Sequence, residues 1–232
     1  MKSASGIRLS MRVWDAPLRL FHGASTLLAA LLALSWVEGW PDIHRWTAET
    51  LLLLLLFRLG WGFAGSETSR FSAFLVAPLS GVEKRDAKRH TTTRLTAPRP
   101  GQATRPDFGH GAAGGWLILV ILLALSGACL TGLCASPSDP FFHLLPSEAA
   151  ANAAFAHSVA LMVLGALFAL HLLLLLIAGR ISGESPLRQF ISGKKRLPAA
   201  TRTPKLAGPG MAALVLLCAL LLTLLLLRQF GA

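Results

Sequence analysis

Long apolar runs alternate with polar segments along this chain. Four runs, at residues 20–37, 116–133, 153–178 and 208–227, contain no Asp, Glu, Lys or Arg. A fifth, at residues 44–64, is the most polar, because it carries Arg45, Glu49 and Arg58 around a block of six leucines. A helix of about 20 apolar residues crosses a bilayer with every backbone polar group satisfied internally. The pattern therefore predicts an all-α integral membrane protein with five transmembrane helices.

The five spans divide into a core and an addition. We expect residues 1–195 to form a transmembrane domain whose first four helices make a four-helix bundle. Residues 196–232 are expected to form a linker and an extra C-terminal helix. Hydrophobic residues make up 53% of the 232 residues and charged residues 14%, whereas soluble domains carry about 25% charged residues. This composition excludes an ordinary soluble enzyme.

The formal net charge is +11, and the basic residues responsible for it lie mostly between the apolar runs. Nineteen of the 22 lysines and arginines lie in three blocks, at residues 1–22, 66–110 and 178–210. The segments 37–43 and 133–152 contain acidic residues and no Lys or Arg. By the positive-inside rule, the N-terminus is cytoplasmic and the C-terminus lies outside. Membrane topology thus explains the basicity, and no nucleic-acid partner is expected. A cleaved signal peptide is not expected either, because no small-x-small pattern follows the first apolar run.

Histidines inside the apolar runs are the main candidate functional residues, because ionisable groups at membrane depth are costly. His157 and His171 are 14 residues apart, so they share one side of a helix at levels about 21 Å apart. From the topology, His22 lies at the cytoplasmic level with His171, and His44 lies at the outer level with His157. Two imidazoles that face each other across a bundle are the axial ligands of a b-type haem. The sequence therefore predicts two bis-histidine haem sites.

Other polar residues have two or more interpretations. Arg19 and Arg58 are candidates to bind haem propionates, or else a topology anchor and a snorkelling side chain. His110 is a candidate quinone-binding or proton-transfer residue, or a plain interfacial histidine. His143 is a surface residue, a substitute ligand of the outer haem or a partner contact. The three cysteines show no C-x-x-C spacing, which argues against iron–sulfur and thiolate zinc sites.

Several motifs resemble the bacterial cytochrome b561 family, which includes the cytochrome b subunits of membrane-bound nickel–iron hydrogenases. They are Arg12-Val13-Trp14-Asp15-Ala16-Pro17-Leu18-Arg19-Leu20-Phe21-His22, His44-Arg45-Trp46, Phe57-Arg58-Leu59-Gly60-Trp61-Gly62-Phe63-Ala64-Gly65 with Arg70-Phe71-Ser72, Gly109-His110 with Gly114-Gly115-Trp116, and the pair His157 and His171. The resemblance covers about residues 11–195. It implies that His22, His44, His157 and His171 are haem ligands, the same four that depth selects. It also implies a bacterial inner-membrane location.

The chain departs from the family pattern at two places. Gly111-Ala112-Ala113 stands where a polar residue and a proline are expected, which weakens the assignment of a quinone site to His110. The helix at 208–227 lies beyond the four-helix core and has no histidine.

The leading functional hypothesis is transmembrane electron transfer through two b haems. Electrons would pass between the quinone pool and a periplasmic partner, either a c-type cytochrome or a dehydrogenase- or hydrogenase-like subunit. One alternative is a stand-alone quinone oxidoreductase that uses a small oxidant such as superoxide. Another is a histidine-based divalent metal transporter, disfavoured because the histidine pairs lie at two depths and no acidic residue lies at midplane.

Overall fold

The computed structural model describes residues 8–75, 112–135, 140–143, 146–198 and 202–228. Among these residues, five helices are long and apolar enough to cross a membrane. They are α1 (Ala16–Val37), α2 (Pro41–Ala64), α5 (Ala112–Ala135), α7 (Ser147–Ser182) and α9 (Pro209–Arg228). The expected all-α membrane architecture with five spans is confirmed.

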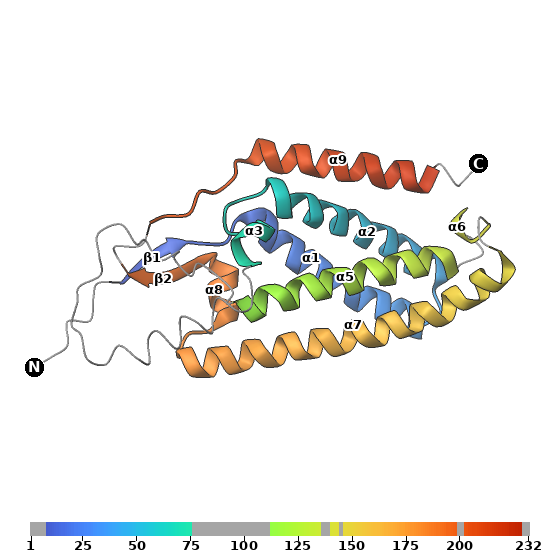
Figure 1. Ribbon diagram of the computed structural model, residues 1–232, viewed down its shortest axis with the longest axis horizontal. Helices are drawn as coiled ribbons and strands as arrows, with labels where there is room; N and C mark the ends of the chain where they lie inside the picture. Colours follow the sequence, from blue (N-terminus) through green and yellow to red (C-terminus); the bar gives the residue numbers. More distant parts are fainter. Residues whose placement is uncertain (1–7, 76–111, 136–139, 144–145, 199–201, 229–232) are drawn as a thin grey trace, which may run out of the picture.

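The long helices lie side by side along the long axis of the molecule (Figure 1). The most extensive contacts pair α5 with α7, α1 with α2, and α2 with α9. The buried core lies where α1, α2, α5 and α9 meet, around Phe21, Leu55, Trp61, Leu122 and Ala219. α7 and α9 therefore flank the core, on opposite sides of it in Figure 1.

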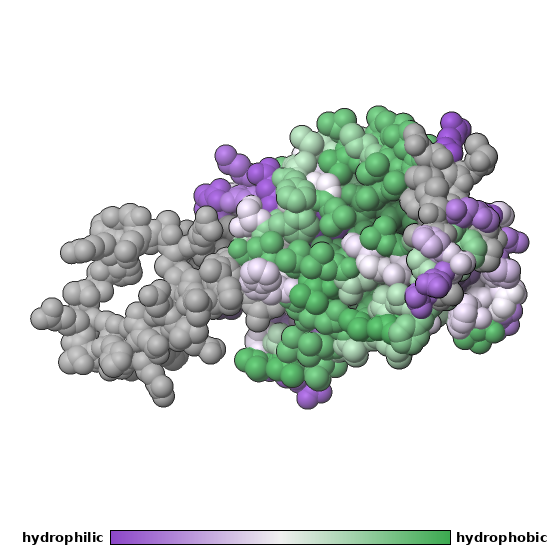
Figure 2. Space-filling model, turned by 45° about the vertical axis from the view of Figure 1, so that its right-hand side comes forward, coloured by the Kyte–Doolittle hydropathy of each residue, from purple (hydrophilic) through white to green (hydrophobic). Residues whose placement is uncertain are grey.

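Apolar side chains also cover the outside of the molecule. Figure 2 shows them gathered over its middle, with hydrophilic residues toward its ends. Leu27 on α1, Leu176 on α7 and Leu225 on α9 are each more than half exposed. An apolar surface of this extent is stable in lipid, where exposed leucine costs nothing.

Short elements occupy the two ends of the bundle. Strands β1 (Arg8–Arg12) and β2 (Lys194–Pro198) pair antiparallel, with Arg8 opposite Pro198 and Arg12 opposite Lys194. The short helices α3 (Phe71–Phe74) and α8 (Pro186–Ser192) lie near this pair, and α6 (Pro140–His143) lies at the opposite end (Figure 1). β2 crosses the boundary expected at residue 195.

Helix ends are set by residues outside the apolar runs. α1 starts four residues earlier than hydropathy alone predicts, because the Asp15 carboxylate accepts the N–H of Leu18 as an N-cap. α2 starts at Pro41, since proline suits the first turn of a helix. α7 has 36 residues and so is about 54 Å long, well beyond the about 30 Å of a hydrocarbon core. It ends at Gly183, whose φ of 68° is the left-handed conformation typical of a helix C-terminus.

Candidate functional site

Asp15 joins three segments at the end of the bundle where α1 begins. One carboxylate oxygen caps α1. The other accepts the indole N–H of Trp61 at 3.0 Å and the hydroxyl of Ser69 at 2.8 Å. Asp15 and Trp61 are both buried. Because α1 is fixed here to the end of α2, the position of His22, two turns into α1, is fixed as well.

His22 and His171 form the first histidine pair. The Nδ1 atom of His22 lies 3.0 Å from the carbonyl oxygen of Leu18. The His22 and His171 imidazoles are close enough to interact electrostatically. Phe190 of α8 covers the His22 ring edge-on, with 5.0 Å between ring centroids. A side chain from α8 therefore closes this pair on one side.

His44 and His157 form the second pair, and they too interact electrostatically. The Nδ1 atom of His44 lies 3.1 Å from Ser35 Oγ and 3.2 Å from the carbonyl oxygen of Leu32. The Nδ1 atom of His157 lies 2.9 Å from the carbonyl oxygen of Ala128. Each ring of this pair is thus anchored to a neighbouring turn or helix.

The anchoring fixes which ring nitrogen can bind a metal. A carbonyl oxygen only accepts hydrogen bonds, so Nδ1 carries the proton in His22, His44 and His157. The Nε2 lone pair of each ring is then available to iron, the arrangement usual for metal-binding histidines. All four rings are half-buried. The ring of His171 makes no hydrogen bond with the described residues.

Helix packing leaves room beside these rings. α1 and α7, which carry His22 and His171, each pack mainly on a different partner, α2 and α5. A Cβ atom added at Gly23, Gly127 or Gly165 would meet no other atom within 4 Å. Gly132 lies close to His157, where a Cβ would be 3.0 Å from the ring. α1 and α7 are therefore not packed tightly on each other, as a planar group held between them would require.

Arg58 is a buried cation next to the first pair. It is 3% exposed, it interacts electrostatically with His22 and Asp15, and its guanidinium lies 5.1 Å from the centre of the Phe71 ring. Its Nη1 atom has no hydrogen-bond partner among the described residues. A buried guanidinium with an unused donor fits a carboxylate such as a haem propionate.

Arg19 has a backbone partner. Its Nη1 atom donates to the carbonyl oxygen of Ile191 at 2.5 Å, which ties α1 to the end of α8. Its Nε atom is buried and has no partner among the described residues. The contact gives Arg19 a structural role, and its roles as topology anchor and propionate partner both stay predictions.

The structure describes one of the two other predicted candidates. His143 is exposed in α6, with its ring against Phe142. His110 lies outside the described residues, as does His90.

Sequence reasoning missed the role of α8 and Phe190. A helix-start signal was present, since Ser185 precedes Pro186 and its hydroxyl accepts the N–H of Arg188. It was overlooked because α8 has only 7 residues and no apolar run. The Asp15, Trp61 and Ser69 cluster had no such signal, because its members are far apart in the sequence.

The fold defines a class, the multi-pass helical membrane proteins. A sequence model of the prokaryotic cytochrome b561 family matches residues 13–193, so the chain belongs to that family. No curated protein and no solved structure compared with the chain matched it. The protein is therefore a multi-pass membrane cytochrome that transfers electrons across the membrane through b-type haem. The family also suggests quinone as a redox partner.

Proposed function

We propose that this cytochrome holds two b haems, one between His22 and His171 and one between His44 and His157. The support is the pairing itself: four histidines from three helices meet two by two, and three of them have Nδ1 hydrogen-bonded to a carbonyl oxygen. Haem iron with two imidazole ligands is a one-electron carrier. Two such carriers at different depths provide a path across the bilayer.

The chain's own residues place and tune the two irons. Leu18, Leu32 and Ala128 orient three imidazoles through their carbonyl oxygens, which also makes the rings stronger ligands. Arg58 binds a propionate of the haem at His22 and His171 and stabilises its reduced form with positive charge. Phe190 and Phe21 flank His22 and exclude water from that side. Burial and charge of this kind set haem potentials.

The proposed path runs between the quinone pool and a periplasmic redox partner. The basic blocks support a cytoplasmic N-terminus in a bacterial inner membrane, which puts the His22 haem on the cytoplasmic side. Quinone then reacts near that haem, with His110 as the candidate proton-transfer residue. A c-type cytochrome or a dehydrogenase-like subunit meets the outer haem.

Haem content tests the proposal. We would measure haem b per polypeptide by pyridine haemochrome on detergent-purified protein, together with the dithionite-reduced spectrum. The expected result is two haems and a sharp low-spin α band. A content of one haem per polypeptide would mean that one of the two histidine pairs does not hold haem. No haem, from cells able to supply it, would overturn the proposal and favour a metal transporter.

A further inference from the structure

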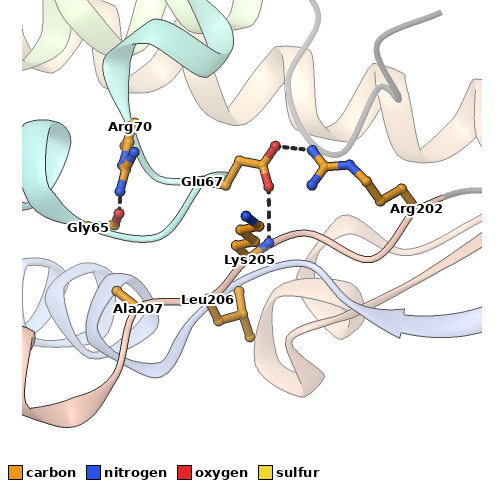
Figure 3. A pocket seen from close by; sticks show the side chains of 7 residues that line it. All are labelled: Gly65, Glu67, Arg70, Arg202, Lys205, Leu206 and Ala207. Carbon is orange, nitrogen blue, oxygen red and sulfur yellow. Dashed lines mark hydrogen bonds and ion pairs between the residues drawn. The ribbon is translucent and has the colours of Figure 1, made fainter. Parts of the chain in front are cut away.

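A polar pocket of about 400 Å³ lies where α2 ends and the segment before α9 passes it. Figure 3 shows its lining, which comes from the turn after α2 and from the linker that leads to α9. The lining residues are Gly65, Glu67, Arg70, Arg202, Lys205, Leu206 and Ala207. The linker half of the pocket lies beyond residue 193, where the family match ends.

Hydrogen bonds hold the linker against the turn. The N–H of Glu67 donates to the carbonyl oxygen of Lys205 at 2.9 Å, and the N–H of Lys205 donates to Glu67 Oε2 at 3.0 Å. The N–H of Ala207 donates to Ser66 Oγ at 2.9 Å. Arg202 forms an ion pair with Glu67. The two halves of the pocket are therefore held in a fixed relation before any ligand binds.

The pocket carries an excess of positive charge. Arg70, Arg202 and Lys205 face one carboxylate, that of Glu67, so the net charge is +2. Glu67 remains ionised, because the Lys205 N–H and the Arg202 guanidinium lower its pKa. The Arg202 guanidinium is paired with this carboxylate. The Nε atom of Arg70 donates to the Gly65 carbonyl oxygen at 2.8 Å, which holds the Arg70 side chain beside Gly65 in the pocket lining (Figure 3).

The level of the pocket matches that of lipid headgroups. α2 ends at Ala64 and α9 begins at Pro209, and helix ends lie near the bilayer interface. Phe63, two residues before Gly65, and Met211, four residues after Ala207, are exposed, at 75% and 41%. The positive groups of the pocket suit the anionic headgroup of a lipid, and the exposed apolar side chains suit its acyl chains.

We propose that this pocket binds the phosphate-bearing headgroup of an anionic glycerophospholipid, with the acyl chains along α2 and α9. Arg70 and Lys205 contact the phosphate, and Arg202 keeps Glu67 away from it. The bound lipid links α9 at the membrane surface to α2, which lies in the part of the chain that the family model matches. The site does not involve the haem ligands.

Native mass spectrometry of the full-length holoprotein tests this site. Protein in detergent is incubated with phosphatidylglycerol or, at equal concentration, with phosphatidylcholine, and retained lipids are counted. The test variant is Arg202→Gln with Lys205→Gln, which keeps the backbone hydrogen bonds of Lys205. The matched control is Arg188→Gln with Lys194→Gln, which removes the same charge from another basic region. The haem content of each variant shows that it is folded.

The wild-type protein and the control should retain one phosphatidylglycerol tightly, and the test variant should bind it about tenfold more weakly or worse. Phosphatidylcholine should bind weakly to all three. Equal weakening in the test variant and the control would overturn the proposal, because general charge would then explain binding. Equal retention of the two lipids would overturn it too. Displacement of phosphatidylglycerol by millimolar inorganic phosphate would show a free-anion site and exclude the lipid.

Discussion

The proton on an imidazole decides which of its nitrogens can bind a metal. In His22, His44 and His157 that proton is on Nδ1, because each Nδ1 faces a carbonyl oxygen. Nε2 is the nitrogen farther from the helix backbone, so it reaches farthest into the space between helices. At the proposed haem sites, these rings would need little reorientation to bind iron.

The histidine pairs predict how haem is lost on substitution. His22→Ala and His171→Ala should each remove the same haem, and His44→Ala and His157→Ala should each remove the other. Each variant leaves one ligand, which is too few for a stable low-spin site. Reduced-minus-oxidised spectra and redox titrations of the four variants identify which haem remains.

His143→Ala is the control for this series. It should retain both haems, because His143 is exposed in α6. Loss of the outer haem in this variant would make His143 a ligand. Loss of the same haem in His22→Ala and His157→Ala would show that the pairs are assigned wrongly.

Arg58 should raise the potential of the haem at His22 and His171, because its buried positive charge favours the reduced iron. Arg58→Met should lower the midpoint potential of that haem by roughly 50–100 mV, as expected for a unit charge about 10 Å away at intermediate dielectric. The midpoint potential of the other haem should change much less. Potentiometric titration measures both potentials.

Arg58→Lys separates charge from packing. It should restore most of the potential, since the charge is kept. A potential equally low in Arg58→Lys and Arg58→Met would mean that the side chain acts through its contacts with Phe71 and not through its charge.

At the residue scale, the structure brings His22 near His171 and His44 near His157, as depth along the helices predicts. His22, His44, His157 and His171 could be sorted into two levels because helix rise and topology fix depth. The Ile191 partner of Arg19 could not be predicted, because the two residues are 172 positions apart. Such contacts depend on how the helices dock, which hydropathy does not describe.

Single elements show the same limit. Apolar runs located all five long helices, but they underestimated the length of α7. Its first turns contain Ser, Glu and Ala residues, which extend a helix without being strongly apolar. The β1 and β2 strands have five residues each and are polar, so their pairing carried no pattern in the sequence.

The end of α2 depends on one glycine. A Cβ at Gly65 would overlap the carbonyl oxygen of Trp61 and lie 2.7 Å from its indole. Gly65→Ala should therefore destabilise the protein by about 1–3 kcal/mol, because Trp61 is buried and cannot move away freely. The melting temperature in detergent measures the loss.

Gly210→Ala is the matched control, because a Cβ at Gly210 would meet no atom within 4 Å. It should leave the melting temperature unchanged or raise it slightly. An unchanged melting temperature in Gly65→Ala would show that the end of α2 can rearrange.

The attachment of the linker should depend on pH through Glu67. The Lys205 N–H and Arg202 lower the pKa of this carboxyl below its ordinary value of 4.5. A lowered pKa means that the attachment is stabilised above about pH 4.5 and loses this contribution as the pH falls through the lower folded value. Hydrogen exchange at Lys205 and Ala207, corrected for its intrinsic pH dependence, should show protection at pH 6 that is reduced at acid pH.

Glu67→Gln removes the titration and keeps an oxygen acceptor. Its protection should be lower than that of the wild type at pH 6 and should not change toward acid pH. A pH dependence as large as in the wild type would assign the effect to another group.

At the scale of the whole molecule, the chain has two helical hairpins, α1 with α2 and α5 with α7, and a fifth helix on α2. If each of the five long helices of the described residues crosses the membrane once, Arg8 and Arg228 lie on opposite sides of it. The basic blocks predict that the N-terminus is cytoplasmic and the C-terminus is outside.

Reporter fusions measure this topology. Alkaline phosphatase, which is active only outside the cytoplasm, should be active when fused after residue 232 or after residue 40. It should be inactive when fused after residue 100 or after residue 200. The reverse pattern would place the His22 pair on the outer side and reverse the proposed path.

The pairing of β1 with β2 has a consequence for how the protein is made. β1 leaves the ribosome first, but its partner β2 is synthesised only after the four long helices α1, α2, α5 and α7, since Arg8 pairs with Pro198. The N-terminal strand therefore stays without its β2 partner while α1, α2, α5 and α7 are synthesised and enter the membrane. The Arg19 contact with Ile191 forms in the same late step. Closure of this end of the bundle thus follows insertion of the four long helices between the two strands.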